Sequence, residues 1–314
     1  MIEHEHIDAS YPARWRFIGM HIMDVADLKV FDAVARLGSM SRAALELHTV
    51  QSNVTGRIRS LEFEVGVALF ERHVRGVQMT PAGQRMLPYA ARAARLVADA
   101  RLAALDDGPP SGTLALGALW TTGALQLSHA LSRFATLYPQ VALSLTTGTS
   151  DGLTTAVADC RLDGAFVAGP QRDPGLDIEW VFSEELVLVT PAAMQSLNDV
   201  RTVDNLKTIV FSQGCSYRER LDLLLAEMGV TPVAALAFGS IEAIVSCVAA
   251  GIGITLLPQA IVSDAAQQNR VAVHALTSDT ARMETLFVRR RDAYLSSAMR
   301  AFLDVARAQA GATA

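Results

Sequence analysis

Apolar residues recur at helical spacing near the start of the chain, where two short helices are separated by a tight turn at His48 and Thr49. In the second helix the apolar positions lie three or four residues apart and therefore share one face: Val50, Val54, Ile58 and Leu61. The opposite face is polar and contains no acidic residue from position 50 to position 60. This pattern predicts a helix-turn-helix whose second helix, over Val50–Leu61, enters the major groove of DNA. An ordinary helical hairpin with a solvated face would show the same periodicity.

The polar face of this helix carries Gln, Asn and Arg, the side chains that pair with base edges in a major groove. A two-stranded wing is predicted over residues 72–79, where arginines would contact phosphates and so position the protein. The predicted DNA-binding residues are Gln51, Ser52, Asn53, Thr55, Arg57 and Arg59 in the helix, with Arg72 and Arg75 in the wing. The alternative for the wing residues is that they are solvated loop arginines.

A long helix is predicted to begin at Thr80–Pro81 and to continue to about Asp106. Thr80 would be the N-cap, and Pro81 suits the first turn because its missing N–H costs nothing there. Pro88 should bend this helix or mark a break near its start. Further along, apolar residues form a seam that needs a partner: Ala91, Ala94, Ala98, Leu102 and Leu105. The chain's own C-terminal half is one candidate partner.

Residues 108–112, with the sequence Gly-Pro-Pro-Ser-Gly, are predicted to form a hinge. Beyond the hinge, strand and helix patterns alternate, which predicts an α/β domain with a largely parallel sheet. The predicted strands are 113–118, 141–146, 163–167, 185–189, 209–212, 235–238, 270–275 and 285–289. The predicted helices are 123–138, 152–160, 217–228, 240–250 and 296–309.

Composition narrows the class of protein. The 314 residues suggest about two domains, and a net charge of −5 means that any DNA contact must depend on a local basic surface. No apolar run reaches the ~18 residues expected of a membrane span, and the polar N-terminus does not resemble a signal peptide. The three widely spaced cysteines suit a reducing cytoplasm. No zinc spacing, phosphate loop, dinucleotide fingerprint or catalytic triad is recognisable, so no metal, cofactor or enzymatic activity is predicted.

Residues 23–88 resemble the winged helix-turn-helix of the LysR-type transcriptional regulators. The matching residues are Leu28, Phe31, Val34, Gly38-Ser39, Ala43-Ala44, Leu47, Gln51 to Leu61-Glu62, Gly66, Leu69 to Arg72 and Thr80 to Gly83. One departure is Thr49-Val50, where many members have Ser before the Gln, although Thr49 is still able to cap the helix. The resemblance implies binding to double-stranded DNA with inverted symmetry. It also implies that the long helix pairs two subunits within a dimer or tetramer.

The C-terminal half resembles the effector-binding domain of the same family, which is related in fold to type 2 periplasmic binding proteins. The matching residues are Leu116-Gly117, Tyr138-Pro139, Leu162 to Gly164, Ser240 to Ile244, Val248 to Ile254 and Leu257-Pro258. The resemblance implies a winged helix-turn-helix domain over 23–80, a linker helix and hinge over 81–110, and an effector-binding domain over 111–314. The last would consist of subdomain I, about 111–183 and 284–314, and subdomain II, about 184–283. Residues 1–22 show no periodicity and are predicted to be a disordered extension.

The two subdomains would be joined by crossover strands near Ser183–Glu185 and Met283–Phe287, with a ligand cleft between them. Polar strand-to-helix turns should line this cleft, because ligands of open α/β sheets bind at strand ends. The predicted effector-binding residues are Trp120, Thr121, Thr122, Thr149, Ser150, Gln213, Ser216, Arg218 and Ser240. Helix N-termini favour an anion, so the predicted effector is a small molecule with a carboxylate preferred. A neutral ligand is the alternative, because Arg218 is the one charged candidate in these turns and is equally suited to a surface ion pair.

The sequence therefore predicts a cytoplasmic DNA-binding regulator controlled by a small-molecule effector. Two alternatives remain open at this point. The chain would be a small-molecule binding protein if the helix-turn-helix served only for assembly. It would be a redox sensor if Cys215, at a predicted helix N-terminus, had the lowered thiol pKa that such a position favours.

Overall fold

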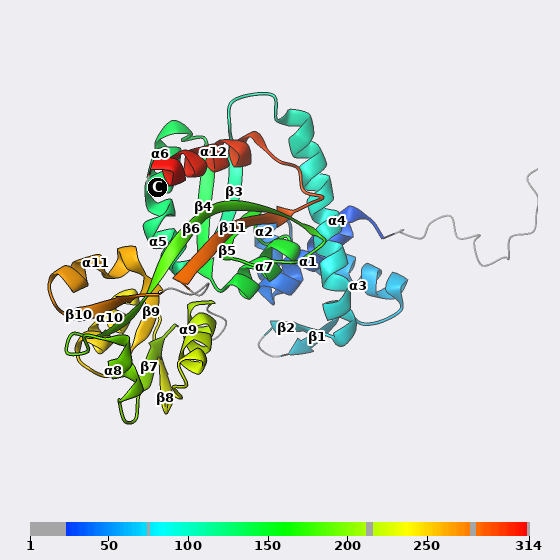
Figure 1. Cartoon of the computed structure of the whole chain (residues 1–314). Coiled ribbons are helices and arrows are strands. Elements are labelled where there is room, and N and C mark those ends of the chain that lie inside the picture. The colour runs from blue at the N-terminus through cyan, green and yellow to red at the C-terminus, as the bar shows by residue number, and fades with distance from the viewer. Residues whose placement is uncertain (1–22, 74–75, 212–215, 277–280, 313–314) are drawn as a thin grey trace, which may run out of the picture. The chain divides into compact units, whose positions relative to one another are not determined.

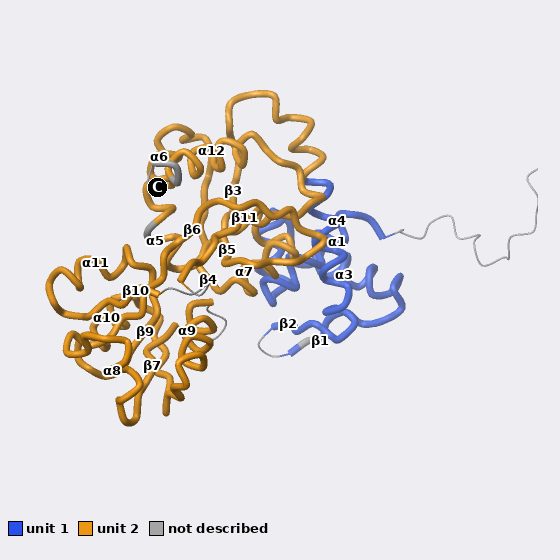
Figure 2. Tube along the Cα trace, in the orientation of Figure 1, with its two compact units in different colours: residues 1–98 blue, residues 99–314 orange. Residues whose placement is uncertain are grey.

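The structure is a computed structural model that describes residues 23–73, 76–211, 216–276 and 281–312. The chain divides into two compact units, residues 1–98 and residues 99–314 (Figure 2). The N-terminal extension predicted over residues 1–22 lies outside the described residues.

The first unit contains short helices, a β-hairpin and the greater part of a long helix (Figure 1). They are α1 (Val25–Leu37), α2 (Met40–Glu46), α3 (Gln51–Val65), β1 (Phe70–His73) and β2 (Gly76–Met79), followed by α4 (Pro81–Leu105). Val54, Ile58 and Leu61 of α3 are buried in the core of this unit, together with Phe31 of α1. The predicted apolar face of the second helix is confirmed at these three positions. The prediction that Val50 belongs to this apolar face is wrong, because Val50 is the exposed N-cap residue of α3.

The ends of these helices follow from particular side chains. Gly38 and Gly66 end α1 and α3 in the left-handed conformation that glycine adopts at low cost. Thr80 caps α4 as predicted, because its Oγ1 accepts the N–H of Gly83 at 3.1 Å. The predicted cap by Thr49 is wrong: its Oγ1 accepts a hydrogen bond from the side chain of Asn53 instead. Helix α4 continues past Pro88, so a break at this residue is excluded.

The second unit is built on a mixed seven-stranded sheet with the order β10-β6-β11-β5-β3-β4, in which β9 also pairs with β6. Its strands are β3 (Gly112–Leu119), β4 (Val141–Gly148), β5 (Gly164–Ala168), β6 (Leu176–Pro191), β9 (Thr255–Pro258), β10 (Val271–Ala275) and β11 (Arg282–Arg290). β3 is parallel to β4 and β5, but β6 is antiparallel to β9, β10 and β11, and β11 is antiparallel to β5. The prediction of a largely parallel sheet is therefore wrong. Each of these antiparallel pairs contains β6 or β11.

β6 is a single strand of 16 residues that belongs to both halves of this unit. From Leu176 to Glu185 it pairs with β11, and from Leu186 to Pro191 it pairs with β9, β10 or both. The sequence predicted a strand over the second portion only, at residues 185–189, with a crossover near Ser183–Glu185. Figure 1 shows β6 passing from the half that contains β3 and β4 to the half that contains β9 and β10.

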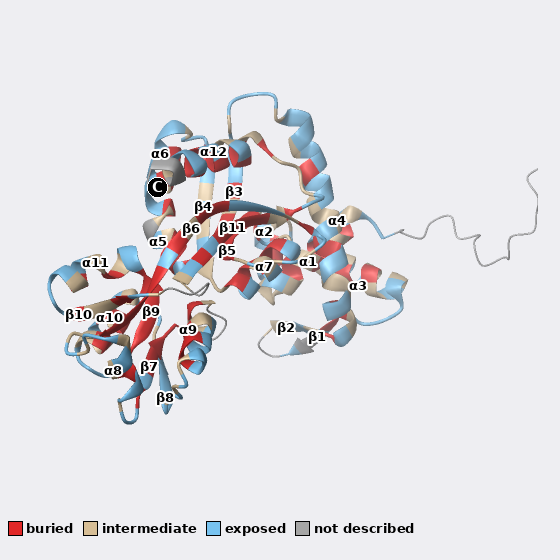
Figure 3. Ribbon diagram, in the orientation of Figure 1, coloured by how far each residue is buried: buried red, intermediate tan, exposed pale blue. Residues whose placement is uncertain are grey.

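Helices cover the sheet in both halves, and Figure 3 shows their buried faces turned toward it. They are α5 (Trp120–Leu125), α6 (Leu127–Leu137), α7 (Ser150–Ala158) and α12 (Ser297–Ala312), then α8 (Leu197–Arg201), α9 (Ser216–Glu227), α10 (Ile241–Ala249) and α11 (Gln259–Gln267). β7 (Lys207–Val210) and β8 (Ala234–Ala237) form a separate parallel pair. The predicted helix over 123–138 is two helices, and α8 and α11 were not predicted.

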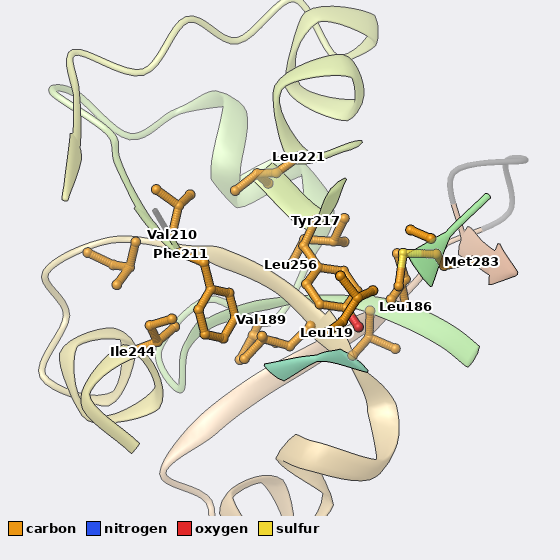
Figure 4. Close-up of a cluster of buried hydrophobic side chains, with 14 of the residues drawn as sticks. Leu119, Leu186, Val189, Val210, Phe211, Tyr217, Leu221, Ile244, Leu256 and Met283 are labelled. Carbon is orange, nitrogen blue, oxygen red and sulfur yellow. The ribbon is translucent and has the colours of Figure 1, made fainter. Parts of the chain in front are cut away.

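Two apolar cores stabilise the unit. In one, Phe302 of α12 contacts Phe134 of α6 and also Phe166 of β5, which packs the two helices on the sheet. The other runs from α7 through Leu186 of β6 to the helices around β9, and Figure 4 shows part of it. Since β6 contributes to both cores, its residues link the packing of the two halves.

The last part of α4 is fixed to the α/β unit by buried polar contacts. Asp99 accepts a hydrogen bond from the Arg290 guanidinium at 3.3 Å, and both side chains are buried. Arg290 also contacts Asp292 and the thiol of Cys160. Asp106 accepts the N–H of Ser297 at 2.7 Å at the start of α12. The C-terminal end of α4 is thus tied to the end of β11 and to the start of α12.

The Asp99–Arg290 pair generates a stability prediction. Asp99→Asn should destabilise the second unit by about 1–3 kcal/mol, because it removes a buried carboxylate from the Arg290 guanidinium, which Asp292 still contacts. Asp304→Asn, which changes an exposed partner of Arg307, should cost less than ~1 kcal/mol. Urea unfolding of the two full-length variants measures the difference, and equal midpoints would contradict the assignment.

Candidate functional site

The exposed face of α3 is the first candidate site. Gln51, Ser52, Asn53 and Arg59 are exposed on it, and Thr55 is half-buried. Ser41 of α2 donates a hydrogen bond to Oε1 of Gln51 at 3.0 Å, and Asn53 donates to Thr49 at 2.9 Å. These bonds orient two of the amide side chains that the sequence assigned to base contacts. Ser41 was not predicted as part of the site, although it lies ten residues before Gln51 across the predicted turn.

Gly56 lies in the same exposed face and leaves it open, since a Cβ at this position would meet no atom within 4 Å. A helix can approach a nucleic-acid backbone or base edge closely where no side chain projects. The face therefore combines amide and guanidinium donors with one gap that lets DNA come close to the helix.

Arg57 differs from Arg59 although both were predicted to bind DNA. Its Nη1 lies 2.8 Å from Oδ1 of the buried Asp27 of α1 and 3.8 Å from the carboxylate of Asp24. Asp27 and Asp24 also form the capping box of α1. Arg57 therefore joins α3 to the start of α1, whereas Arg59 lies on the exposed face of α3.

The wing is the hairpin of β1 and β2. The N–H of Val77 donates to the carbonyl of Gly38 at 3.1 Å, which attaches the hairpin to the end of α1. Gly76 has φ +136°, and a Cβ there would lie 2.6 Å from the Gly38 oxygen, so the attachment requires glycine. Of the two predicted wing arginines, Arg75 lies outside the described residues. Arg72 lies in β1 at the register position opposite Val77.

The second candidate site is a cavity between the two halves of the α/β unit. Its walls are Leu119, Trp120, Thr121, Gly148, Thr149, Phe211, Ser216, Tyr217, Phe238 and Gly239. These residues come from the ends of β3, β4, β7 and β8 and from the first turns of α5 and α9. The cavity thus lies where the strand-end rule places a ligand. None of the described residues that line it is charged.

Four of the predicted effector-binding residues line this cavity: Trp120, Thr121, Thr149 and Ser216. Phe238 also lines it and belongs to a strand-to-helix turn that the sequence predicted to line the cleft, whereas the aromatic walls Phe211 and Tyr217 were not predicted. They directly flank the polar turns that were predicted, so apolar residues next to such turns were the available signal.

Thr122, Ser150, Arg218 and Ser240 are not among the residues that line this cavity, and Gln213 lies outside the described residues. Arg218 forms an ion pair with Asp222 at 3.9 Å on its own helix. Ser240 caps α10 by accepting the N–H of Ala243. Ser150 accepts the N–H of Ala168 at 3.1 Å and lies 3.4 Å from Ser216, which joins α7 to α9. Thr122 is fully buried, and its hydroxyl has no hydrogen-bond partner among the described residues.

Behind the cavity wall lies a buried carboxyl group. Tyr217 donates a hydrogen bond from its hydroxyl to Oε2 of Glu184 at 2.9 Å, and the same hydroxyl contacts Oγ1 of Thr121. Glu184 is in β6, Tyr217 in α9 and Thr121 in α5, so the chain of contacts joins both halves of the unit. Burial raises the pKa of Glu184 above its ordinary value, while hydrogen bonds from Tyr217 and Gln126 oppose that shift. Oε1 of Glu184 has no hydrogen-bond partner among the described residues.

Comparisons with known proteins match both parts of the chain. Residues 25–84 match the family model of the bacterial regulatory helix-turn-helix protein, lysR family, and residues 107–311 match the LysR substrate binding domain. The HTH-type transcriptional regulator GltR of Bacillus subtilis (strain 168) is 40% identical over 281 residues, which cover 90% of this chain and 95% of GltR.

Solved structures show the same fold. Full-length OxyR from Pseudomonas aeruginosa, solved as a variant, is similar with a TM-score of 0.74 and 21% identity, over 91% of this chain and 95% of that one. Full-length CbnR complexed with its target DNA has a TM-score of 0.60 and 23% identity, over 91% of this chain and 100% of that one.

A helix-turn-helix with an exposed polar helix, followed by a two-part α/β unit with a cavity between its parts, defines a ligand-controlled DNA-binding regulator. With family models matching both units and a relative 40% identical over nearly its whole length, the chain belongs to the LysR family of transcriptional regulators. The predicted family, fold class and general function are confirmed. No helix among the described residues is long and apolar enough to cross a membrane.

Proposed function

We propose that the regulator reads its operator through the exposed face of α3, with Gln51, Asn53 and Arg59 on base edges and Ser52 and Thr55 beside them. The acid-free exposure of this face, with a gap at Gly56, is the observation that carries the proposal. Arg57 acts indirectly, because it holds α3 against α1 through Asp27. Arg72 and Arg75 would contact phosphates from the wing. The operator would have inverted symmetry, since a two-fold protein reads two half-sites.

Two neighbouring arginines test this assignment. Arg59→Ala should weaken binding to the operator by ~1–3 kcal/mol and relax its sequence preference, without a change in thermal stability. Arg57→Ala should lower the melting temperature, because it leaves the buried Asp27 unpaired. Gel shifts with DNA from upstream of the chain's own gene, together with thermal unfolding, separate the two effects. Full affinity and specificity in Arg59→Ala would reject the base-contact role. It would also favour the alternative that the helix-turn-helix serves only for assembly.

We propose that α4 pairs two copies of the chain through an exposed stripe of apolar residues. Along it lie Tyr89, Ala93, Leu96, Ala100 and Ala103, spaced by three or four residues. Tyr89 is 75% exposed and Leu96 is 46% exposed, which leaves their apolar surface without cover in one chain. The seam predicted from the sequence lies on the opposite side of the helix. It is less suited to pairing because its first member, Ala91, is already buried.

The two sides of α4 can be separated by one pair of substitutions. Leu96→Asp should dissociate the oligomer, because it introduces a charge into the apolar stripe. Ala98→Asp places the same charge on the opposite, exposed side and should leave association unchanged. Light scattering at micromolar concentration gives the mass of each variant and distinguishes dimer from tetramer. Dissociation of Ala98→Asp alone would favour the seam predicted from the sequence.

We propose that the effector is a small neutral molecule with an apolar body, bound in the cavity between β3, β4, β7 and β8. Trp120, Phe211 and Phe238 would enclose the apolar body, and hydroxyl groups of Thr121, Thr149 and Ser216 would orient it. A carboxylate is the second candidate. It would suit a neighbouring polar cavity that shares Ser216 and is lined by Arg220, Gln171, Glu219 and Asp151. That cavity offers the cation that the first one lacks.

Calorimetry with a panel of small aromatic alcohols, amides and carboxylates tests the choice of cavity. A neutral effector should lose at least tenfold in affinity in Thr121→Val, since a hydrogen bond with a buried hydroxyl is removed. Arg218→Ala should have no effect on it. Binding by carboxylates alone, weakened by Arg220→Ala and not by Thr121→Val, would overturn the neutral assignment and place the effector in the polar cavity.

We propose further that the chain acts by binding alone, without enzymatic activity, and that it works in the cytoplasm where DNA is accessible. The proposal includes three domain limits: a DNA-binding domain over 23–80, a linker helix and hinge over 81–110, and an effector-binding domain over 111–314. The chain would cross between the two subdomains near Ser183–Glu185 and Met283–Phe287. β6 and β11 would be the crossover strands. Cys215, the candidate redox residue, lies outside the described residues.

A further inference from the structure

We infer that Glu184 sets the hydrogen-bond polarity of the effector cavity through Tyr217 and Thr121, and thereby selects which effectors bind. The inference rests on the proposed function, because it treats this cavity as the effector site. Glu184 does not itself line the cavity, whereas Tyr217 and Thr121 do. It is therefore a positioning residue that acts through its two neighbours.

The direction of each hydrogen bond follows from the number of protons available. When Glu184 is ionised it only accepts, so the Tyr217 hydroxyl must donate to it. The Tyr217 oxygen then accepts from Thr121, whose single hydroxyl proton is used in that bond. Thr121 consequently offers only lone pairs to the cavity. In this state the wall favours an effector group that donates, such as an alcohol or an amide N–H.

Protonation of Glu184 reverses the chain. The carboxyl takes up one proton from solvent, and Oε2 is the favoured site because Oε1 has no partner among the described residues. Oε2–H then donates to the Tyr217 oxygen, Tyr217 donates to Thr121, and the Thr121 hydroxyl donates into the cavity. In this state the wall favours an effector group that accepts, such as a ketone. Only O–H bonds are involved: one forms on Glu184, and the hydroxyl protons of Tyr217 and Thr121 change direction.

The surroundings of Glu184 make this reversal possible. Burial is the main cause that raises its pKa, opposed by Tyr217 of α9 and by Gln126 between α5 and α6. Glu184 of β6 pairs with Met283 of β11. Glu185 follows Glu184, and Glu284 follows Met283. Because side chains alternate along a strand, these two acidic residues belong to the other face of the sheet. Arg220 of α9 interacts electrostatically with Tyr217 and Glu284. Above the raised pKa of Glu184 the cavity wall accepts a hydrogen bond from the effector, and below it the wall donates one.

Infrared difference spectra of the ligand-free full chain across a pH titration test the relay directly. We expect a protonated-carboxyl band that persists above the ordinary Glu value of about 4.3. It should be lost in Glu184→Gln and kept in the matched control Glu284→Gln. A tyrosine ring band should shift with the same midpoint and be lost in Tyr217→Phe, in which the carboxyl midpoint should rise because a donor to the ionised form is removed. Titration of Glu184 in the ordinary range, or a tyrosine band that does not follow it, would overturn the relay.

Two probes of similar shape test the effect of the relay on effector specificity. Acetophenone only accepts hydrogen bonds, whereas 1-phenylethanol also donates them. The affinity ratio of ketone to alcohol should fall about fivefold as pH rises through the measured midpoint. It should be independent of pH in Glu184→Gln and should keep its pH dependence in Glu284→Gln. A constant ratio in wild type, with both probes weakened by Thr121→Val, would reject the inference and leave the cavity assignment intact. Failure of both probes to bind would reject the cavity assignment, and the claim about specificity with it.

Discussion

The pairing of β6 with different neighbours along its length is the constraint on which the α/β unit depends. Its first ten residues bond to β11, and the remaining six pair with β9, β10 or both. Because side chains alternate along a strand, a shift of one residue in either portion would exchange the buried and exposed faces of the whole strand. Phe182 and Leu186, which belong to different cores, would both lose their packing in such a shift. The register of one half is therefore not independent of the register of the other.

Local patterns in the sequence predicted the helix-turn-helix better than the sheet, and the reason is physical. The core positions of α3 and the caps at Gly38, Gly66 and Thr80 depend on residues close in the chain. Thr49 is not the cap because α3 begins one residue later, with Val50 as its N-cap residue, and the Thr49 hydroxyl accepts from the Asn53 side chain. The error shows that even a local rule depends on the residue at which the helix begins.

The sheet was mispredicted where contacts are non-local. The alternation of strands and helices is the same for a parallel sheet and for a mixed one. The two are distinguished by the antiparallel pairings of β6 and β11, which join residues far apart in the sequence. The cavity between the two halves of the α/β unit shows the same limit. Its polar turns were recognisable from the strand-end rule, but Glu184 lies in a predicted crossover, far in sequence from Thr121 and Tyr217. No periodicity marks a carboxyl group that is buried by elements from two halves of a domain.

β11 connects the surroundings of the cavity with the end of α4. At its first residues it pairs with β6 beside Glu184, next to the cavity, and at its last residue Arg290 holds Asp99 of α4. A ligand changes the state of a protein only by as much as its affinity differs between two arrangements. Any arrangement that moves the cavity walls apart must strain the β6–β11 ladder or displace it as a rigid body. Since the Asp99–Arg290 pair is buried and costly to break, a displaced β11 would carry the end of α4 with it. The strand that pairs with β6 beside Glu184 is thus also the element to which the end of α4 is attached.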